Sequence, residues 1–189
     1  MISKTLINSA KEIAYEDSEK NGVPSKFQID FAVEKAQFLA NKLGANEDVC
    51  ILGAYLMDCK LGTAYIAGNL GKHVSLSKDE AEMLLSKDKD ITDTEKNNVI
   101  QCVLQHHGSS GFYSKEAEIV CNADCYKFIS IKGVIGSIKG MRDMPLDAII
   151  KLFIEKADEK WQALSLDYCK KALKIEYTNI KLFLESYKN

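Results

Sequence analysis

Helical periodicity runs through nearly the whole chain and constrains its fold more than any other feature of the sequence. Only two prolines and eleven glycines interrupt its 189 residues. Apolar residues recur at intervals of three and four, which places them on one face of an α-helix. No segment of useful length alternates between apolar and polar residues as a half-buried strand would. The sequence therefore predicts an all-α protein that forms one compact domain.

The apolar stripes and the residues that break helices divide the chain into segments. A long helix is expected to begin near Pro145, which suits a first helical turn, with a stripe through Trp161 to Tyr168 and onward to Leu173. The other predicted helices cover about residues 3–18, 29–43, 49–58, 95–107, 115–131 and 180–187.

Two segments are expected to lack long helices. Residues 62–76 are rich in glycine and predicted to be irregular, and the pattern from Ser77 to Glu80 then resembles a capping box for a short helix. Gly133, Gly136 and Gly140 punctuate a second segment, which is predicted to be flexible.

Charge and composition exclude several classes of partner. The net charge is −2, the isoelectric point is near 6.0, and no acidic or basic tail is present, which argues against nucleic acid as the main partner. The N-terminus lacks a continuous apolar signal region, since Lys4, Lys11 and Glu12 interrupt it. No run approaches 18 apolar residues, so no membrane span is expected. These features predict a cytoplasmic protein.

The six cysteines lie mostly within helical patterns beside apolar residues. They are predicted to be free, buried thiols rather than a disulfide framework. Cys121 and Cys125 are four residues apart and could form a Cys₂His₂ zinc site with His106 and His107, although buried thiols explain the spacing better. A cysteine nucleophile paired with a histidine lacks an identifiable third orienting group.

Polar groups occupy apolar helix faces at three sites: Asp58, Asp124 and the pair His106–His107. Asp58, for example, follows Ile51 by seven residues and so projects from the same stripe. One such residue is commonly a capping or hydrogen-bonding group. An isolated buried carboxylate is costly, however, and three such sites on three helices suit a shared divalent cation.

The order of these residues resembles that in the HD superfamily of metal-dependent phosphohydrolases. The matching segments are Ala54-Tyr-Leu-Met-Asp58, Val103-Leu-Gln-His-His107 and Ile119-Val-Cys-Asn-Ala-Asp124, and the resemblance extends over about residues 27–128. It implies an all-α, HD-domain-like helical bundle formed by a single domain, 1–189. Its core would cover about residues 20–131, and a long C-terminal helical extension would cover about residues 145–188.

The resemblance also implies that one metal position is degenerate. The family's early histidine falls on Gln28, and the histidine of its His-Asp pair falls on Met57, whereas Asp58 and Asp124 match. A thioether is a poor ligand for Mg²⁺, Mn²⁺ or Fe²⁺. The first metal position is therefore expected to be empty or very weak.

The second metal position of the family is retained. By resemblance its ligands are Asp58, His73, His106 and His107, a set suited to one divalent transition metal such as Mn, Fe, Ni or Zn. Asp124 is a further candidate ligand. If the chain is an enzyme, Asp58 and Asp124 are the catalytic candidates, with Asp124 orienting or deprotonating a water molecule.

The implied substrate is a phosphorylated small molecule or a nucleotide. Lys60 and, in the glycine-punctuated segment, Lys132, Lys139 and Arg142 are candidates to bind its negative charge, either on a mobile lid or on an ordinary connecting loop. Arg142 is the only arginine, so no clamp of several arginines can form. The alternative function is a catalytically inactive binding or interaction module without a metal, and the two altered ligands leave both functions open.

Overall fold

The fold is all-α, as the sequence predicts. The computed structural model describes residues 2–141 and 144–187, and within these ranges its regular structure is ten α-helices and one 3-10 helix, η1, without a strand. The elements are α1 (Lys4–Asn21), α2 (Lys26–Leu43), α3 (Glu47–Leu56), α4 (Leu61–Ile66), η1 (Leu70–Lys72), α5 (His73–Lys87), α6 (Asp93–Gln105), α7 (Lys115–Ile129), α8 (Ile131–Lys139), α9 (Leu146–Ala163) and α10 (Asp167–Ser186).

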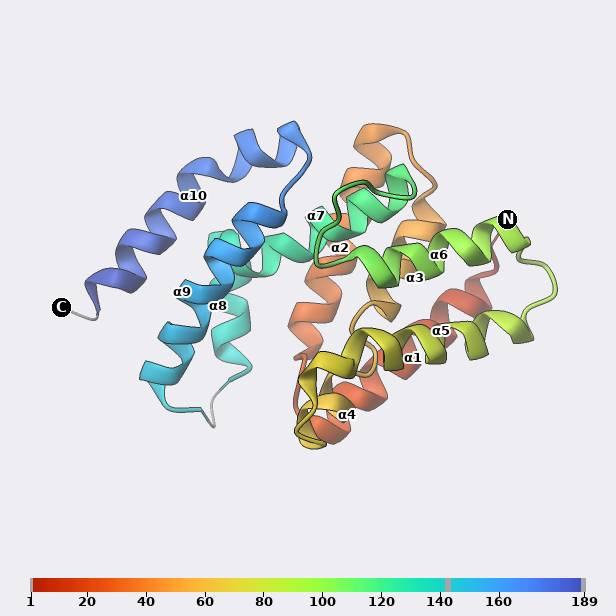
Figure 1. The fold of residues 1–189 in the computed structure, drawn as a ribbon, viewed down its shortest axis with the longest axis horizontal. Helices are drawn as coiled ribbons and strands as arrows, with labels where there is room; N and C mark the ends of the chain where they lie inside the picture. Colours follow the sequence, from red (N-terminus) through yellow and green to blue (C-terminus); the bar gives the residue numbers. More distant parts are fainter. Residues whose placement is uncertain (1, 142–143, 188–189) are drawn as a thin grey trace.

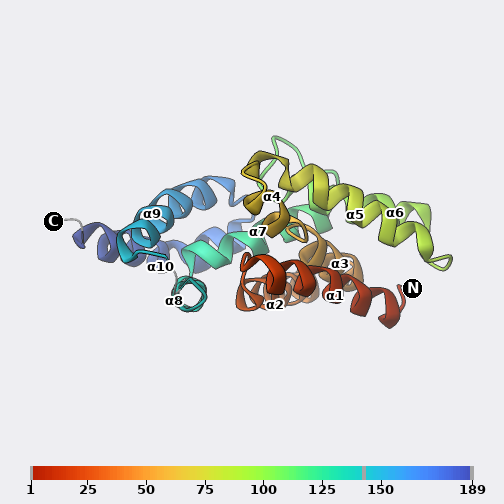
Figure 2. The same ribbon diagram turned by 90° about the horizontal axis from the view of Figure 1, so that it is seen from below.

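Helices α3 and α7 form the centre of the bundle. Both α2 and α6 pack against each of them. Figure 2 shows α1 and α2 on one side of this centre and α4, α5 and α6 on the other, whereas α8, α9 and α10 gather at the C-terminal end (Figure 1). Helix α9 packs against α7, so the C-terminal helices are joined to the central helix itself.

Local capping chemistry sets several helix ends. Ser25 with Gln28 and Thr92 with Glu95 form reciprocal capping boxes at the starts of α2 and α6. The predicted capping box at Ser77 is wrong, because α5 already begins at His73. The Ser77 hydroxyl instead accepts a hydrogen bond from the backbone N–H of Lys60, at 3.1 Å.

The two segments predicted to be irregular or flexible are in fact helical. Residues 61–76 form α4, η1 and the first turn of α5, and residues 131–139 form α8. Gly136 on α8 lies directly against the ring of Phe27, where a Cβ atom would have no room. Close packing rather than flexibility therefore explains this glycine.

The single long helix predicted from Pro145 is also wrong, since it ends at Ala163 and α10 begins at Asp167. Asn122 stabilises the turn between them. Its Oδ1 accepts hydrogen bonds from the backbone N–H groups of Ser165 and Leu166, at 3.3 and 3.2 Å, and its Nδ2 donates to the Ser165 hydroxyl. These bonds satisfy backbone donors that a continuous helix would have used.

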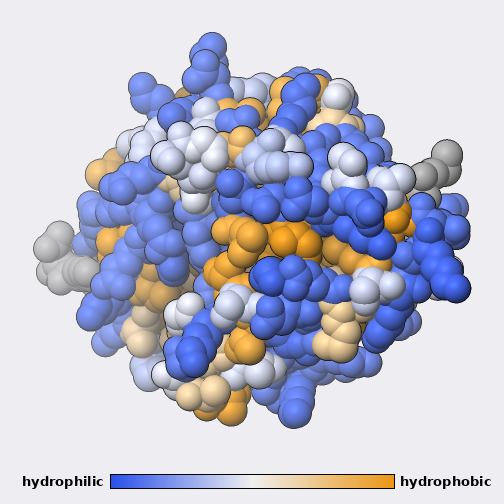
Figure 3. Space-filling model, turned by 45° about the vertical axis from the view of Figure 1, so that its right-hand side comes forward, coloured by the Kyte–Doolittle hydropathy of each residue, from blue (hydrophilic) through white to orange (hydrophobic). Residues whose placement is uncertain are grey.

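The hydrophobic core has two parts. The larger part fills the bundle around α3 and α7, and all six cysteines are free and buried, as predicted. The smaller part joins α8, α9 and α10 through Val134, Ile149, Ile150, Phe153, Ile180 and Leu184. The face drawn in Figure 3 is mainly hydrophilic, with hydrophobic side chains gathered across its middle.

One segment, Glu47–Ile66, is long and apolar enough by composition to cross a membrane. In the folded chain a turn divides it into α3 and α4. More than half of its most apolar window, 56%, is buried inside the molecule, and Leu52 and Leu56 are fully buried. The burial of this segment in the core accounts for its high hydropathy.

A glycine substitution tests the close packing of α3 against α6 and α7. A Cβ atom on Gly53 would lie 2.5 Å from Cys102 Cβ and 3.2 Å from a methyl carbon of Val120. We expect Gly53→Ala to lower the free energy of unfolding by about 1–3 kcal/mol, because overpacking outweighs the gain in helix propensity. Urea titration measures the change. Gly111→Ala, with no atom within 4 Å of the new Cβ, is the matched control and should change little.

Candidate functional site

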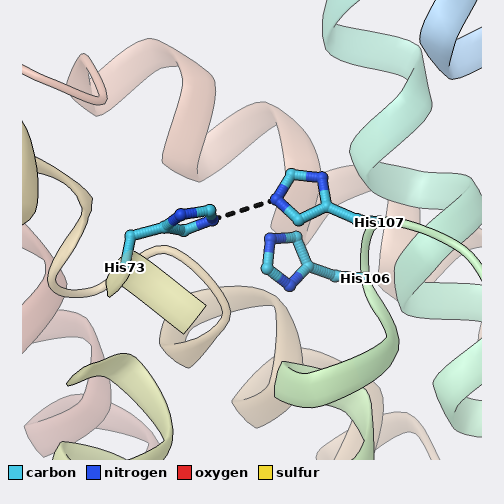
Figure 4. A group of neighbouring side chains, drawn as sticks. All are labelled: His73, His106 and His107. Atoms are coloured by element: carbon cyan, nitrogen blue, oxygen red, sulfur yellow. Dashed lines mark hydrogen bonds between the residues drawn. The ribbon is translucent and has the colours of Figure 1, made fainter. Parts of the chain in front are cut away.

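Three histidines from two parts of the chain converge at the centre of the candidate site. His73 is the first residue of α5, and His106 and His107 follow directly after α6. His73 Nε2 lies 2.9 Å from His107 Nε2, and one ring nitrogen from each of the three residues lies within 4.8 Å of the other two. Figure 4 shows the three rings facing one another. The fold thus brings His73, which is distant in sequence, to the adjacent pair His106–His107.

Backbone contacts fix the orientation of two of these rings. His73 Nδ1 lies 2.8 Å from the carbonyl oxygen of Leu70, and His106 Nδ1 lies 2.7 Å from that of Val103. A ring nitrogen facing a carbonyl must donate, so each neutral ring presents an Nε2 lone pair to the site. His106 Nε2 is fully buried and has no hydrogen-bond partner among the described residues. An unsatisfied imidazole lone pair beside two more histidines suits a borderline metal ion.

Asp58 completes this group of ligands from the turn that follows α3. Its Oδ1 lies 3.4 Å from His106 Nε2 and 3.7 Å from His73 Nε2. Its Oδ2 accepts a hydrogen bond from Lys127 Nζ at 2.9 Å. One oxygen of this carboxylate therefore faces the histidines and the other faces a lysine.

Two buried lysines hold Asp124. Lys127 Nζ lies 2.5 Å from Asp124 Oδ1, and Lys160 Nζ lies 2.7 Å from Asp124 Oδ2. Lys160 and Asp124 are each only 1% exposed and Lys127 is 4% exposed. Lysine is almost never buried this deeply unless it is paired. Asp58, Lys127, Asp124 and Lys160 form an alternating chain of charges, which we call the ion network.

The ion network keeps its members charged. Burial alone would raise the pKa of Asp58, but the Lys127 ammonium holds this pKa well below its usual range. Burial also opposes ionisation of Asp124, and the two ammonium groups lower its pKa. The carboxylates in turn raise the pKa of both lysines against the effect of burial. Two negative and two positive charges therefore balance inside the protein.

Lys160 also connects the ion network to the histidines. Its Nζ lies 2.9 Å from His107 Nδ1, and an ammonium there must donate. His107 Nε2 then carries the proton of the neutral ring and donates to His73 Nε2. Partial desolvation of the ring and the nearby Lys160 ammonium lower the pKa of His107 to about 3, although 38% of its side chain is exposed, so the ring is neutral at physiological pH. Both ring nitrogens of His73 and of His107 thus have hydrogen-bond partners, whereas among the described residues His106 Nε2 has none.

A cavity of about 440 Å³ opens onto these groups. Asp58, Asp124, both network lysines, His73 and His107 line its polar end. Most of the remaining wall is apolar, and α9 with the residues just before it contributes Met141, Met144, Ala148 and Leu152. Helix α9, which belongs to the predicted C-terminal extension, therefore forms one side of the cavity.

The two altered ligand positions have separate structural explanations. Met57 is 1% exposed and belongs to the hydrophobic core. Gln28 lines the cavity, but its Oε1 accepts hydrogen bonds from the backbone N–H and the hydroxyl of Ser25 in the capping box, at 3.0 and 3.3 Å. Neither side chain takes the place of a histidine ligand.

The lysines predicted to bind substrate are not among the described residues that line this cavity. Lys60 pairs with Glu80 at 3.0 Å, and Lys132 pairs with Glu34 at 2.8 Å. Lys132 and Lys139 line a different hollow beside α8. The fourth candidate, Arg142, lies outside the described residues.

The two neighbouring cysteine thiols point to backbone carbonyls. Cys121 Sγ lies 3.8 Å from the carbonyl oxygen of Ala163, and Cys125 Sγ lies 3.2 Å from that of Cys121. In the described part of the chain, the group of possible ligand atoms close enough to share an ion consists of the three histidines, without a cysteine. The geometry does not assemble the alternative Cys₂His₂ site.

Weak signals for Lys127 and Lys160 were present in the sequence. Lys127 follows Asp124 by three residues, a spacing that permits an ion pair on one helix face. Lys160 follows Phe153 by seven residues and therefore lies on the buried stripe of α9, where the prediction placed Trp161. Trp161 is instead partly exposed and stacks on Tyr177 with ring centroids 4.5 Å apart. The sequence pattern predicted the aromatic Trp161 in the core, but the charged Lys160 is the buried residue.

Solved structures share this arrangement of helices. A structural-genomics protein from Lactobacillus plantarum aligns with a TM-score of 0.71 at 16% identity, covering 100% of this chain and 97% of its own. A predicted HD superfamily hydrolase from an uncultured Thermotogales bacterium aligns with a TM-score of 0.65 at 14% identity, covering 97% and 90%. No protein-family model and no curated protein matches the sequence. At these identities the likeness concerns the fold alone: the chain shares the fold of the two solved structures, one of which is a predicted HD superfamily hydrolase.

Proposed function

We propose that His73, His106, His107 and Asp58 hold one divalent transition metal and that the protein hydrolyses a phosphate ester of a small molecule, nucleotides included. The observation that carries this proposal is the buried, unpartnered Nε2 of His106, which faces Asp58 beside two further imidazoles. Rings held through Nδ1 by backbone carbonyls are typical of metal-ligating histidines. The donor set suits Mn, Fe, Ni or Zn.

A metal at this position would polarise a phosphoryl oxygen and lower the pKa of a bound water. The chain's own residues prepare the site. The ion network keeps Asp58 ionised and directs one of its oxygens to the histidines. Asp124 has a lowered pKa and is held by two lysines, which makes it a poor proton acceptor. We therefore assign Asp124 an orienting role, which it exerts through Lys127 and Lys160.

The cavity gives this proposal a place for the substrate. Its polar end would take the phosphate group beside the histidines, and its apolar wall would take the remainder of the molecule. Lys151 and Lys156 on α9 also line the cavity and supply positive charge. They replace Lys60, Lys132 and Lys139 as candidates for binding the negatively charged substrate.

The alternative is an inactive binding module that keeps the fold and the cavity. One observation favours it: the hydrogen-bond chain from Lys160 through His107 to His73 is complete without a metal. To coordinate a metal through Nε2, His107 would have to move its proton to Nδ1, which faces the Lys160 ammonium. Metal content and activity distinguish the two functions.

Elemental analysis of protein purified without chelator tests the metal site. We expect about one Mn, Fe, Ni or Zn per chain, and loss of most of it in a His106→Ala/His107→Ala variant, because two of the four ligands are removed. Cys121→Ala is the matched control and should retain the metal, whereas a Cys₂His₂ site would lose it. Unchanged metal content in the double histidine variant would show that the ligands are assigned wrongly.

Activity is tested on a panel of phosphate monoesters and nucleotides with added Mn²⁺. We expect turnover that Asp58→Asn reduces by at least about 100-fold, since the change removes a charged ligand and one partner of Lys127. The Lys132→Ala variant, altered in the separate hollow, should retain wild-type rates. Metal-free protein without turnover on the whole panel would favour the inactive binding module.

The ion network also predicts how stability depends on pH. Carboxylates with a lowered pKa contribute stability above the unfolded value near 4, and this contribution is lost as the pH falls through the folded values. We expect Lys160→Met to cost about 3–5 kcal/mol at pH 7, because Asp124 loses a buried partner. The difference from wild type should shrink as the pH falls from about 5 to 2.

Urea titrations across this pH range measure the effect. Lys156→Met, which removes a partly exposed lysine paired with Glu159 at 2.6 Å, is the control and should change stability by less than about 1 kcal/mol. A loss in the Lys160 variant that does not vary with pH would mean that packing, and not charge, explains the role of Lys160.

A further inference from the structure

The ammonium of Lys127 lies between two carboxylates that come from separate parts of the chain. Asp58 belongs to the turn after α3, and Asp124 belongs to α7. Lys127 Nζ lies 2.9 Å from Asp58 Oδ2 and 2.5 Å from Asp124 Oδ1, and it therefore bridges them as a bound cation would. These are the two carboxylates that the family resemblance assigns to a first metal ion.

At the two altered ligand positions, the described side chains do not replace the histidines that the resemblance implies. Gln28 directs its Oε1 to the capping box of α2, and Met57 is buried in the core. Without a cation between them, Asp58 and Asp124 would be two buried like charges, each of which disfavours ionisation of the other. An internal cation is therefore a requirement of this arrangement, whether or not the histidines hold a metal.

The lysine and a bridging metal ion exclude each other. An ion bound to Asp58 Oδ2 and Asp124 Oδ1 would need the space that Nζ occupies at hydrogen-bonding distance from both atoms. It would also meet the positive charge of the ammonium in a site that is nearly closed to water, where like charges repel strongly. Lys160 on the other oxygen of Asp124 adds a second positive charge nearby.

We propose that Lys127 is a built-in cation that replaces the first metal ion, so that the site holds at most one metal, on its histidine side. Removal of the lysine side chain then uncovers a latent site for a hard divalent cation between Asp58 and Asp124. This inference does not depend on the proposed hydrolase activity, because it concerns the carboxylate pair and not the histidines. Lys127 acts as a positioning residue that fixes both carboxylates.

Thermal unfolding with and without Ca²⁺ tests the proposal. Ca²⁺ prefers oxygen ligands and binds imidazole poorly, so it reports on the carboxylates and not on the histidines. We expect Lys127→Ala to melt well below wild type without Ca²⁺. At a Ca²⁺ concentration about 100-fold above its dissociation constant, its melting temperature should rise by about 5 to 10 °C.

Lys127→Met is the matched control. Its side chain fills the space of the lysine stem without a charge, so it should be destabilised and should not respond to Ca²⁺. Wild type should not respond either, because the ammonium occupies the position. A folded Lys127→Ala variant whose melting temperature is unaffected by Ca²⁺ would overturn the proposal, as would an equal rise in wild type.

Metal stoichiometry decides the question if neither variant folds. Native mass spectrometry of wild type with excess Mn²⁺ should find at most one ion per chain, and two ions per chain would refute the replacement of the first metal by Lys127. One ion agrees with both proposals. Zero ions per chain would contradict the proposed metal-dependent function but not the proposal that Lys127 replaces the first metal ion. Failure of one proposal can therefore be distinguished from failure of the other.

Discussion

The buried ion network of Asp58, Lys127, Asp124 and Lys160 is the constraint on which the rest of the site depends. Each charge is nearly inaccessible to water, and removal of one partner would leave an uncompensated charge in the interior. The network also joins the turn after α3 to α7 and α9, three parts of the chain that are distant in sequence. Pairing of its charges therefore fixes both the position of Asp58 beside the histidines and the docking of α9.

Asp58 links the ion network to the candidate metal site, because its two oxygens face different groups. One oxygen is held by Lys127, and the other faces His106 and His73. A carboxylate kept ionised by an internal ammonium would be able to ligate the proposed metal through its free oxygen without a second metal ion. The same pairing explains how the fold can keep two aspartates in place although positions 28 and 57 are occupied by glutamine and methionine and not by histidines.

The sequence predicted the fold class well and the local structure unevenly. The periodic stripes correctly predicted the central helices, including α2, α3, α6 and α7, because an apolar face with a 3.6-residue period can be buried on one side only as a helix. The glycine-rich segments were wrongly predicted to be irregular or flexible. In the second of them, Gly136 is required for close contact with Phe27, and that contact cannot be seen in the sequence. The break before α10 was missed for a similar reason, since Asn122, more than 40 residues earlier, stabilises it.

The sequence by itself determined which groups could take part in the site. Asp58, Asp124 and the adjacent histidines are polar residues on apolar stripes, and that pattern requires partners whatever the fold. Only the tertiary structure decided what those partners are. Lys160 lies 36 residues beyond Asp124 and on another helix, and His73 lies 33 residues before His106, so packing alone brings these side chains together. The reason is physical: a pattern along one helix shows which side is buried, but not which charge from another helix will meet it there.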